Sequence, residues 1–401
     1  MKPAPNFLTQ PISSRIQSID FLRGVVMIIM ALDHVRDYFH ADAFLYSPTD
    51  LSKTTVLLFF TRWITHFCAP VFMFLAGTSA FLIGQRKTKA ELSVFLLKRG
   101  IWLIFLDLFI VYFGWSFDIS YHVVLFNVIW VFGVSMIVLA ALIYLPIKII
   151  LAIGLIIVAT HNVLDNVTIE ENTLPAFLWA LIHKQSSFSF GGRTFFVAYP
   201  VIPWVGVMAL GYCLGNLYTD HYNSKTRKKI LVVIGSIAIF LFIALRASNV
   251  YGDSSHWSQQ SSGLFTFLSF LNPSKYPPSL LFLLMTLGPA LLFLAFTEKT
   301  SGSLVNAISV YGRVPLFFYI IHIYFIHFLA MLAAGLFPGF SWSDMILNEL
   351  LWFTDNLKGF GFSLGIVYLI WVGVVLGLYP LCRWYYNYKK DHKQNKWLSY
   401  L

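Results

Sequence analysis

Charge is scarce in this chain of 401 residues. Asp, Glu, Lys and Arg together make up 11% of the sequence, whereas a globular protein carries about 25%. Hydrophobic residues make up 58% and aromatic residues 18%, and no polar stretch is long enough to form a soluble domain of its own. These proportions exclude an ordinary soluble protein. We therefore predict one integral membrane domain over residues 1–401, with the lipid bilayer as its surroundings.

Cysteine is also rare, and the motifs of several soluble enzyme classes are missing. The three cysteines, Cys68, Cys213 and Cys382, lie in or at the end of apolar runs without metal-like spacing, which indicates small buried side chains. The sequence has no Walker loop, no dinucleotide-binding glycine motif and no HExxH motif, which disfavours an ATPase, a dinucleotide enzyme and a zinc protease. The eleven histidines are spread over many helices, and we expect no metal ion.

The formal charge of +10 comes from basic residues at the ends of apolar stretches. A nucleic-acid partner would require a positive patch on a folded soluble face, so we expect no nucleic acid. Lys and Arg residues that cluster beside apolar spans indicate instead how a protein is oriented in a membrane.

Long apolar stretches dominate the rest of the sequence, and a membrane helix needs about 20 such residues. We predict an all-α, polytopic membrane fold with about ten spanning helices. The predicted ranges are 21–39, 56–84, 99–117, 122–145, 148–163, 195–218, 230–247, 278–297, 304–336 and 362–384. The range 304–336 is long enough to tilt strongly or to break near Pro315. The loops 250–277 and 337–361 are expected to form folded caps on the outer face.

The segment 174–182 is apolar but short, and it fits a re-entrant helix, an interfacial helix or, with its flanks, an eleventh span. With ten spans and both termini cytoplasmic, most of the 28 lysines and arginines fall on the cytoplasmic side. An eleventh span would place the basic cluster Lys225–Lys229 and the basic tail outside. We therefore predict ten spans with both termini in the cytoplasm, and no full span at 174–182.

The first predicted span contains an unusual group of ionisable residues. Burying one such residue at the centre of a bilayer costs roughly 2.5–3.5 kcal/mol, so these residues are rare there and usually functional. Arg23 and His34 are eleven residues apart, which is about three helical turns, so they face the same direction with about 16 Å between them. Asp37 shares the face of His34. An adjoining stripe holds Asp33, Arg36, Asp37 and His40.

This group has the composition of a proton-transfer site. Histidine titrates near neutral pH, and a carboxylate beside it can fix its tautomer and stabilise its charged form. We predict His34 as a general base inside the membrane, with Arg23 at the cytoplasmic end of the same face. The alternative is structural, in that Asp33, Arg36 and Asp37 pair with one another or with the next helix.

Two further spans carry candidate residues. Arg62 and His66 are spaced i, i+4 near the outer side, and a proline shortly after them can open a cavity in the helix. A snorkelling Arg and an interfacial His are the alternative for this pair. In the ninth span, Arg313 and His327 are about 40° out of phase and are predicted to line one groove. His322 falls on the opposite face, where packing is the alternative to a functional role.

Five sequence blocks spread over nearly the whole chain resemble one known family. They are Arg15–His40 (RIQSIDFLRGVVMIIMALDHVRDYFH), Pro70–Leu82 (PVFMFLAGTSAFL), Tyr199–Gly211 (YPVIPWVGVMALG), Lys275–Gly288 (KYPPSLLFLLMTLG) and Tyr311–Phe318 (YGRVPLFF). These blocks resemble the bacterial family related to heparan-α-glucosaminide N-acetyltransferase. That family is similar to a wider group of transmembrane acyltransferases whose first helix carries an Arg, ten further residues and a His, and Arg23 and His34 match this pattern.

The resemblance implies transfer of an acetyl or other short acyl group from cytoplasmic acyl-coenzyme A to a sugar amine or hydroxyl across the membrane. Acetyl-coenzyme A is the expected donor substrate. The resemblance also implies that Arg23, with Arg99 and Arg313, binds the phosphates of coenzyme A. The residues expected to line the substrate site are Arg62, His66, His322 and His327.

In the same scheme, His34 acts as the general base or is itself transiently acylated. Asp33 and Asp37 orient it or compensate its charge, and Arg36 anchors the acceptor or the oxyanion. The lysosomal relative carries Asn at the position of His34, which leaves His40 as the other candidate for the base.

The bacterial character of the blocks implies the bacterial inner (cytoplasmic) membrane and an envelope glycan as the acceptor, and it leaves a homodimer open. The alternative function is a transporter or channel for a small solute or proton, in which the same intramembrane charges form a relay. A relay does not need a basic inner rim in phase with an intramembrane histidine. We therefore favour the enzyme.

Overall fold

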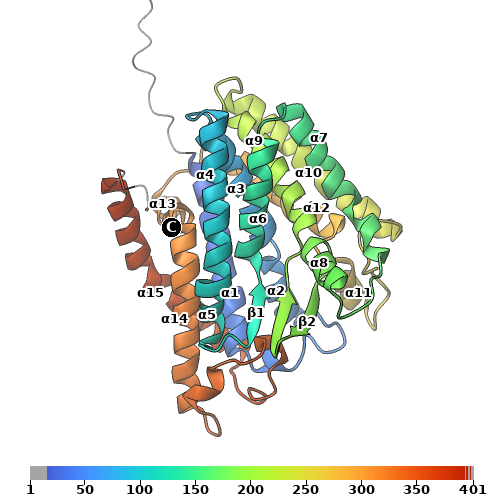
Figure 1. Ribbon diagram of the computed structural model, residues 1–401, viewed down its shortest axis with the longest axis vertical. Coiled ribbons are helices and arrows are strands. Elements are labelled where there is room, and N and C mark those ends of the chain that lie inside the picture. Colours follow the sequence, from blue (N-terminus) through green and yellow to red (C-terminus); the bar gives the residue numbers. More distant parts are fainter. Residues whose placement is uncertain (1–15, 393, 396–397, 399–401) are drawn as a thin grey trace, which may run out of the picture.

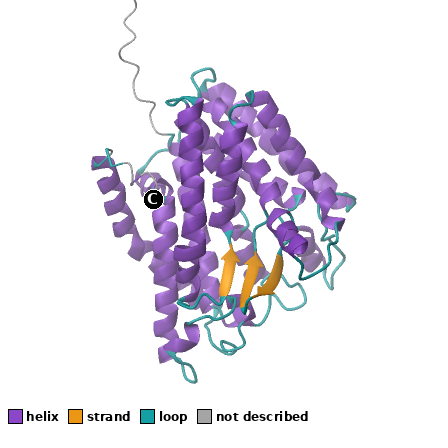
Figure 2. Cartoon of the chain, in the orientation of Figure 1, coloured by secondary structure: helices purple, strands orange, loops and turns teal. Residues whose placement is uncertain are grey.

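Helices make up most of the part of the chain that the computed structural model describes, residues 16–392, 394–395 and 398 (Figure 1, Figure 2). The α-helices are α1 Gln17–Phe39, α2 Val56–Thr65, α3 Cys68–Gly84, α4 Lys89–Phe105, α5 Tyr112–Ser116, α6 Val128–Leu142, α7 Ile147–Thr160, α8 Leu174–Ile182, α9 Val201–Gly215, α10 Ser224–Ser248, α11 Gly263–Phe270, α12 Leu280–Thr297, α13 Ser303–Arg313, α14 Pro315–Leu336 and α15 Leu364–Asp391. A π-helical stretch, Leu106–Val111, joins α4 to α5. The strands are β1 Val123–Phe126, β2 Ser186–Phe190 and β3 Arg193–Val197.

Seven helical segments of the described chain are long and apolar enough to cross a membrane. They are Val56–Gly84, Ile147–Asn166, Val201–Tyr218, Ser224–Ser248, Leu280–Thr297, Pro315–Leu336 and Leu364–Asp391. The chain is therefore a mostly helical, multi-pass membrane protein. The number of ten crossings and the cytoplasmic side of both termini stay predictions. Lys2, Arg15, Lys393 and Lys396, which contribute to the charge argument, lie outside the described residues.

Helices α1 and α15 run beside each other in opposite directions. Phe362, just before α15, donates its N–H to Phe39 O at the end of α1 at 2.7 Å, and Trp371 Nε1 donates to Ile28 O at 2.8 Å. Helix α1 therefore begins near the place where α15 ends. This end is uppermost in Figure 1, and we call it the upper end. The end of α1 and the start of α15 lie toward the lower end.

Both predicted cap loops are folded. The loop 250–277 contains α11, and the loop 337–361 contains two 3-10 turns, Trp342–Met345 and Leu351–Phe353. Their placement on the outer face stays a prediction, because it depends on the orientation of the protein in the membrane.

The prediction of an all-α fold is wrong in one part of the chain, which forms a three-stranded sheet in the lower half of the molecule (Figure 2). Strand β3 lies in the middle, parallel to β1 and antiparallel to β2. Gly191 and Gly192 both have positive φ, which suits the two-residue turn between β2 and β3. Because β1 and β3 are extended, the predicted ranges 122–145 and 195–218 become helical only at Val128 and Val201.

Helix α8 occupies the segment for which the charge pattern excludes a full span. Its nine residues make a helix of about 14 Å, whereas the hydrocarbon core of a bilayer is about 30 Å thick. Ala176 and Ala180 of α8 are buried together with Phe188 of β2. Helix α8 therefore covers the sheet and is too short to cross the membrane by itself.

The predicted span 304–336 breaks into two helices. Val314 separates α13 from α14, with φ −131° and ψ 49°, and Pro315 is the first residue of α14, a position that proline favours. The groove predicted from the phase of Arg313 and His327 is therefore wrong, because the phase argument requires one continuous helix.

Helices α1 and α13 touch through their backbones at two glycines. A Cβ atom at Gly24 would lie 2.1 Å from Ile308 O, and one at Gly312 would lie 2.0 Å from Asp20 O. Small residues of this kind allow membrane helices to approach closely. The contact places Arg313, at the end of α13, beside the beginning of α1.

Replacing one of these glycines is expected to destabilise the protein. Gly312→Ala should lower the free energy of unfolding by about 1–3 kcal/mol, because the added methyl group pushes α13 away from α1. Gly373→Ala in α15 is the matched control, since nothing lies within 4 Å of its added Cβ and Ala favours a helix over Gly. Thermal unfolding in detergent measures both variants. Equal melting temperatures would contradict the close contact.

Candidate active site

A cavity of about 950 Å³ extends along α1, and both Arg23 and His34 line it. The shared helical face predicted from their spacing is therefore a wall of one cavity. Six basic residues line the part near the start of α1, and we call them the basic mouth. They are Arg23, Arg86, Lys87, Arg99, Arg313 and Lys389. They come from α1, the α3–α4 turn, α4, α13 and α15, which meet toward the upper end in Figure 1.

Polar contacts hold the helices together at the basic mouth. Arg23 Nη2 donates to Ser79 Oγ at 2.8 Å, and Arg23 Nη1 donates to Gly312 O at 3.3 Å. Arg313 Nε donates to Asp20 Oδ2 at 3.3 Å, and its guanidinium lies 5.1 Å from the centre of the Tyr386 ring. These contacts join α1 to α3 and α13, and α13 to α15. They fix the two guanidinium groups at the entrance.

The three basic residues expected at the inner rim all belong to the mouth. Arg86, Lys87 and Lys389 belong to the basic residues at the ends of apolar stretches, which indicate membrane orientation but not a place in the site. These residues lie far from α1 in the sequence, and helical spacing relates only residues of the same helix. Their proximity to Arg23 therefore follows from the fold alone.

Apolar side chains line the middle of the cavity, and polar side chains return at its other end. The middle is lined by Met27, Met30, Phe72, Phe132 and Met136, among others. We call the other end the deep end, and its residues are Asp33, His34, Asp37, Arg62, Trp115, Tyr199, Lys275, Tyr276 and Trp352. The cavity thus combines a cationic entrance, an apolar middle and a charged deep end.

His34 is hydrogen-bonded to a second histidine. His34 Nδ1 lies 2.8 Å from His322 Nε2, and His322 Nδ1 lies 2.8 Å from Phe318 O. A carbonyl oxygen only accepts, so His322 carries its proton on Nδ1, and its Nε2 accepts the proton of His34 Nδ1. In this neutral pair, His34 Nε2 keeps a free lone pair. Trp115 packs edge-on against the His34 ring at 4.8 Å and restrains its orientation.

The charged residues around His34 pair with one another. Arg62 forms an ion pair with Asp33, and Arg36 forms ion pairs with Asp33 at 2.9 Å and with Asp37. The structural alternative considered for Asp33, Arg36 and Asp37 is thus the arrangement that the contacts show. The partner that fixes the tautomer of His34 is His322, and the two carboxylates act by balancing nearby positive charge.

Arg36 does not take the position expected of a group that anchors the acceptor or the oxyanion. Arg36 is 3% exposed and is absent from the residues that line the cavity. Its Nη2 pairs with both Asp33 and Asp37. Removing one partner from such a buried group leaves an uncompensated charge. Arg36 therefore holds the two carboxylates in place.

The other predicted histidines lie behind the cavity wall. His66 is buried beside Phe282, with ring centres 5.4 Å apart. His327 lies between Gly114 O at 2.9 Å and Met345 O at 2.8 Å. His322 reaches the site only through His34. In the part of the chain that the structure describes, His34 is therefore the histidine that lines the cavity.

His40 caps a short turn just after α1. Its Nδ1 accepts a hydrogen bond from Asp42 N at 3.3 Å, at the start of the 3-10 turn Ala41–Phe44. Burial is the main cause that lowers the pKa of His40, and the nearby Arg36 adds to this effect. His40 is not one of the residues that line the cavity, so its placement favours a structural role.

The deep end also contains two residues that the sequence argument did not identify. Lys275 and Tyr276 precede α12 and line the cavity. They open one of the five sequence blocks, but no spacing rule relates this loop to α1. Within the described residues, no group of three or more His, Cys, Asp or Glu side chains is arranged to hold a metal ion.

The chain matches the model of a known protein family. A family model described as "Heparan-alpha-glucosaminide N-acetyltransferase, catalytic" matches residues 15–247, which is more than half of the chain. The match includes α1 with Arg23 and His34, and it ends before Lys275, Arg313 and His322. No curated protein matches the chain.

Proposed function

The chain belongs to the heparan-alpha-glucosaminide N-acetyltransferase catalytic family, and from this premise we propose that it moves an acetyl or short acyl group from cytoplasmic acyl-coenzyme A to a sugar amine or hydroxyl across the membrane. The observation that carries this proposal is the cavity itself. It joins six basic residues at one end to the free lone pair of a fixed histidine near the other.

The donor fits the order of surfaces along the cavity. Coenzyme A carries its phosphates at one end and its thioester at the other, with an uncharged arm between them. Arginine and lysine at the mouth suit the phosphates, and the apolar middle suits the arm. His34 lies about 16 Å from Arg23 along the continuous helix α1, so the thioester would reach the deep end.

The reaction follows from the tautomer of His34. The acceptor amine or hydroxyl attacks the thioester carbonyl, and His34 Nε2 takes the proton that the acceptor loses. A C–N or C–O bond forms, the C–S bond breaks, and the coenzyme A thiolate takes the proton back from the imidazolium. Labelling of His34 itself in the absence of acceptor would reveal the covalent route instead.

The acceptor would approach through Trp352. This side chain is 40% exposed, it lines the deep end, and its ring lies 6.2 Å from Trp115, which contacts His34. An exposed tryptophan beside polar groups offers an apolar face to a sugar ring. An envelope glycan as the acceptor and the bacterial inner membrane as the location are part of the proposal, as the family resemblance implies.

A transfer assay tests the proposal. Purified protein is incubated with acetyl-coenzyme A, labelled in the acetyl group, and a panel of amino sugars and neutral sugars. We expect label on a sugar and release of coenzyme A that depends on the acceptor. Flux of a solute or of protons into vesicles, without any acyl transfer, would support the transporter alternative and contradict the proposal.

The histidine pair provides a separate prediction. His322→Phe keeps the ring that stacks on Phe318 but removes the acceptor for His34 Nδ1. We expect kcat to fall about 100-fold, because an unfixed tautomer makes a poor base. His322→Gln, whose Oε1 can accept the same bond, should recover part of this loss. Equal kcat values for the two variants would show that His322 only fills space.

A further inference from the structure

Lys275 and Tyr276 lie in a closed turn before α12. Ser279 N donates to Ser274 O at 3.0 Å, and Lys275 pairs with Pro278 in an isolated bridge. The two side chains extend from this turn to the deep end of the cavity. The geometry of the turn therefore determines where an ammonium group and a phenol stand relative to His34.

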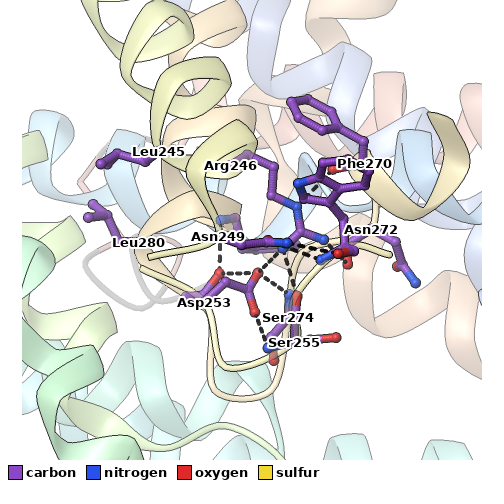
Figure 3. A network of polar contacts seen from close by, with 12 residues as sticks. Leu245, Arg246, Asn249, Asp253, Ser255, Phe270, Asn272, Ser274 and Leu280 are labelled. Atoms are coloured by element: carbon purple, nitrogen blue, oxygen red, sulfur yellow. Dashed lines mark hydrogen bonds and ion pairs between the residues drawn. The ribbon is translucent and has the colours of Figure 1, made fainter. Parts of the chain in front are cut away.

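One carboxylate oxygen holds both ends of this turn. Asp253 Oδ2 accepts from Ser274 N at 2.9 Å and from Ser279 Oγ at 3.1 Å. The other oxygen, Oδ1, accepts from Ser255 N at 2.8 Å. Figure 3 shows Asp253 beside Ser274 and Ser255, below Arg246. Asp253 is 6% exposed and does not line the cavity.

Arg246 fixes Asp253 from the other side. Its guanidinium is buried, lies 3.4 Å from Asp253 Oδ2, and donates to four backbone carbonyls (Figure 3). These are Ser255 O at 2.7 Å, Ser269 O at 2.9 Å, Phe270 O at 3.0 Å and Asn272 O at 3.2 Å. Buried charges are stable only when paired and hydrogen-bonded, and this network meets that condition. The turn is thus anchored to the end of α10.

The turn presents two donors, Lys275 and Tyr276, that take no part in the ion pairs around His34. In those pairs, Asp33 binds Arg36 and Arg62, and Asp37 binds Arg36. Within the described residues, by contrast, no carboxylate lies within ion-pair distance of Lys275, whose Nζ is 5.1 Å from the centre of the Tyr276 ring. The Tyr276 hydroxyl lies beside the Lys275 ammonium and makes a long contact of 3.5 Å with the Tyr199 hydroxyl.

The surroundings make Tyr276 a stronger donor than an ordinary tyrosine. Burial opposes ionisation of its phenol, but the positive charges of Lys275 and Arg62 outweigh this effect and lower its pKa. An O–H group with a lowered pKa donates a stronger hydrogen bond to an anionic oxygen.

We infer that Lys275 and Tyr276 stabilise the oxyanion of the acyl-transfer reaction, and that Asp253 is the residue that positions them. The inference rests on the proposed function. When the acceptor attacks the thioester, the carbonyl oxygen becomes negative. It then accepts a hydrogen bond from Tyr276 Oη and is stabilised by the positive charge of Lys275. When the C–S bond breaks, the carbonyl re-forms, and both donors keep their protons.

Tyr276→Phe and Lys275→Met test the first half of the inference. Each substitution should lower kcat about 10²–10³-fold, and the loss should be the same with neutral and with carboxylate-bearing sugars. The Kd of acetyl-coenzyme A should stay unchanged. A loss confined to the carboxylate-bearing sugars would overturn the oxyanion role, because the residues would then bind the acceptor. A wild type that transfers nothing contradicts the proposed function as well, whereas an active wild type with unaffected variants contradicts this inference alone.

A double-mutant cycle tests the positioning role. Asp253→Asn should lower kcat at least tenfold. Combining it with Tyr276→Phe should lower kcat by less than the product of the two separate losses, since part of the effect of Asp253→Asn is exerted through Tyr276. Asp344→Asn is the matched control, because Asp344 also accepts a backbone N–H in a loop, from Ser341 at 2.8 Å, but lies outside the cavity. If the loss of kcat in the double variant equalled the product of the losses in the two single variants, the positioning role would be overturned.

Discussion

His34→Ala is expected to reduce acyl transfer by about 10²–10⁴-fold, the usual contribution of a general base, and to leave the binding of acetyl-coenzyme A nearly unchanged. The reason is the separation along α1. His34 supplies the free lone pair at the deep end, whereas the phosphates would bind at the basic mouth, about 16 Å away. Steady-state transfer and equilibrium binding measured on the same preparation separate the two effects.

His40→Asn is the matched control for this variant. Asn is a good N-cap residue, so it can keep the hydrogen bond from Asp42 N while it removes the imidazole. We expect transfer by His40→Asn to stay within a few-fold of wild type. If His40→Asn abolished transfer and His34→Ala did not, the base would be His40. The free lone pair of His34 Nε2 would then play no part in the reaction.

Arg99→Gln is expected to weaken acetyl-coenzyme A binding at least tenfold. A hydrogen bond to a charged group contributes about 1.5–3 kcal/mol, and each 1.4 kcal/mol is about a factor of ten in Kd. Arg99 lines the mouth from α4, and the neighbouring Lys98 on the same helix provides a matched control. Isothermal titration in detergent measures the change.

Two comparisons make the Arg99 result specific. Lys98→Gln removes the same charge from the neighbouring position, but Lys98 is exposed and does not line the cavity. The Kd of this variant for acetyl-coenzyme A should therefore stay at the wild-type value. Acetyl-pantetheine carries the thioester without the nucleotide phosphates, so wild type and Arg99→Gln should use it equally. An equal loss with acetyl-pantetheine would mean that Arg99 acts on the fold or the arm and does not bind phosphate.

Much of the fold could be predicted because apolar length alone marks a membrane helix. The sheet could not be predicted in this way. The alternation of Ser and Phe before Gly191 and Gly192 is typical of a hairpin, but the end of β3 runs directly into the apolar stretch of the predicted span 195–218. Strand β1, moreover, pairs with β3 from more than 60 residues away in sequence, and no local pattern encodes that pairing.

The site was predictable where it lies on one helix. The spacing of Arg23 and His34 was sufficient because α1 is continuous from Gln17 to Phe39. The same reasoning failed for His327, because the helix breaks at Val314. It also placed His322 on the face opposite Arg313 and His327, whereas His322 is the histidine of α14 that contacts His34.

The central claim is that the donor enters at the basic mouth and that its acyl group leaves on the other side of the membrane. Vesicles containing the protein, with labelled acetyl-coenzyme A outside and an acceptor sugar trapped inside, test it directly. We predict label on the trapped sugar for wild type and none for His34→Ala. Label only on sugar added to the same side as acetyl-coenzyme A, or no label on either sugar, would contradict the claim.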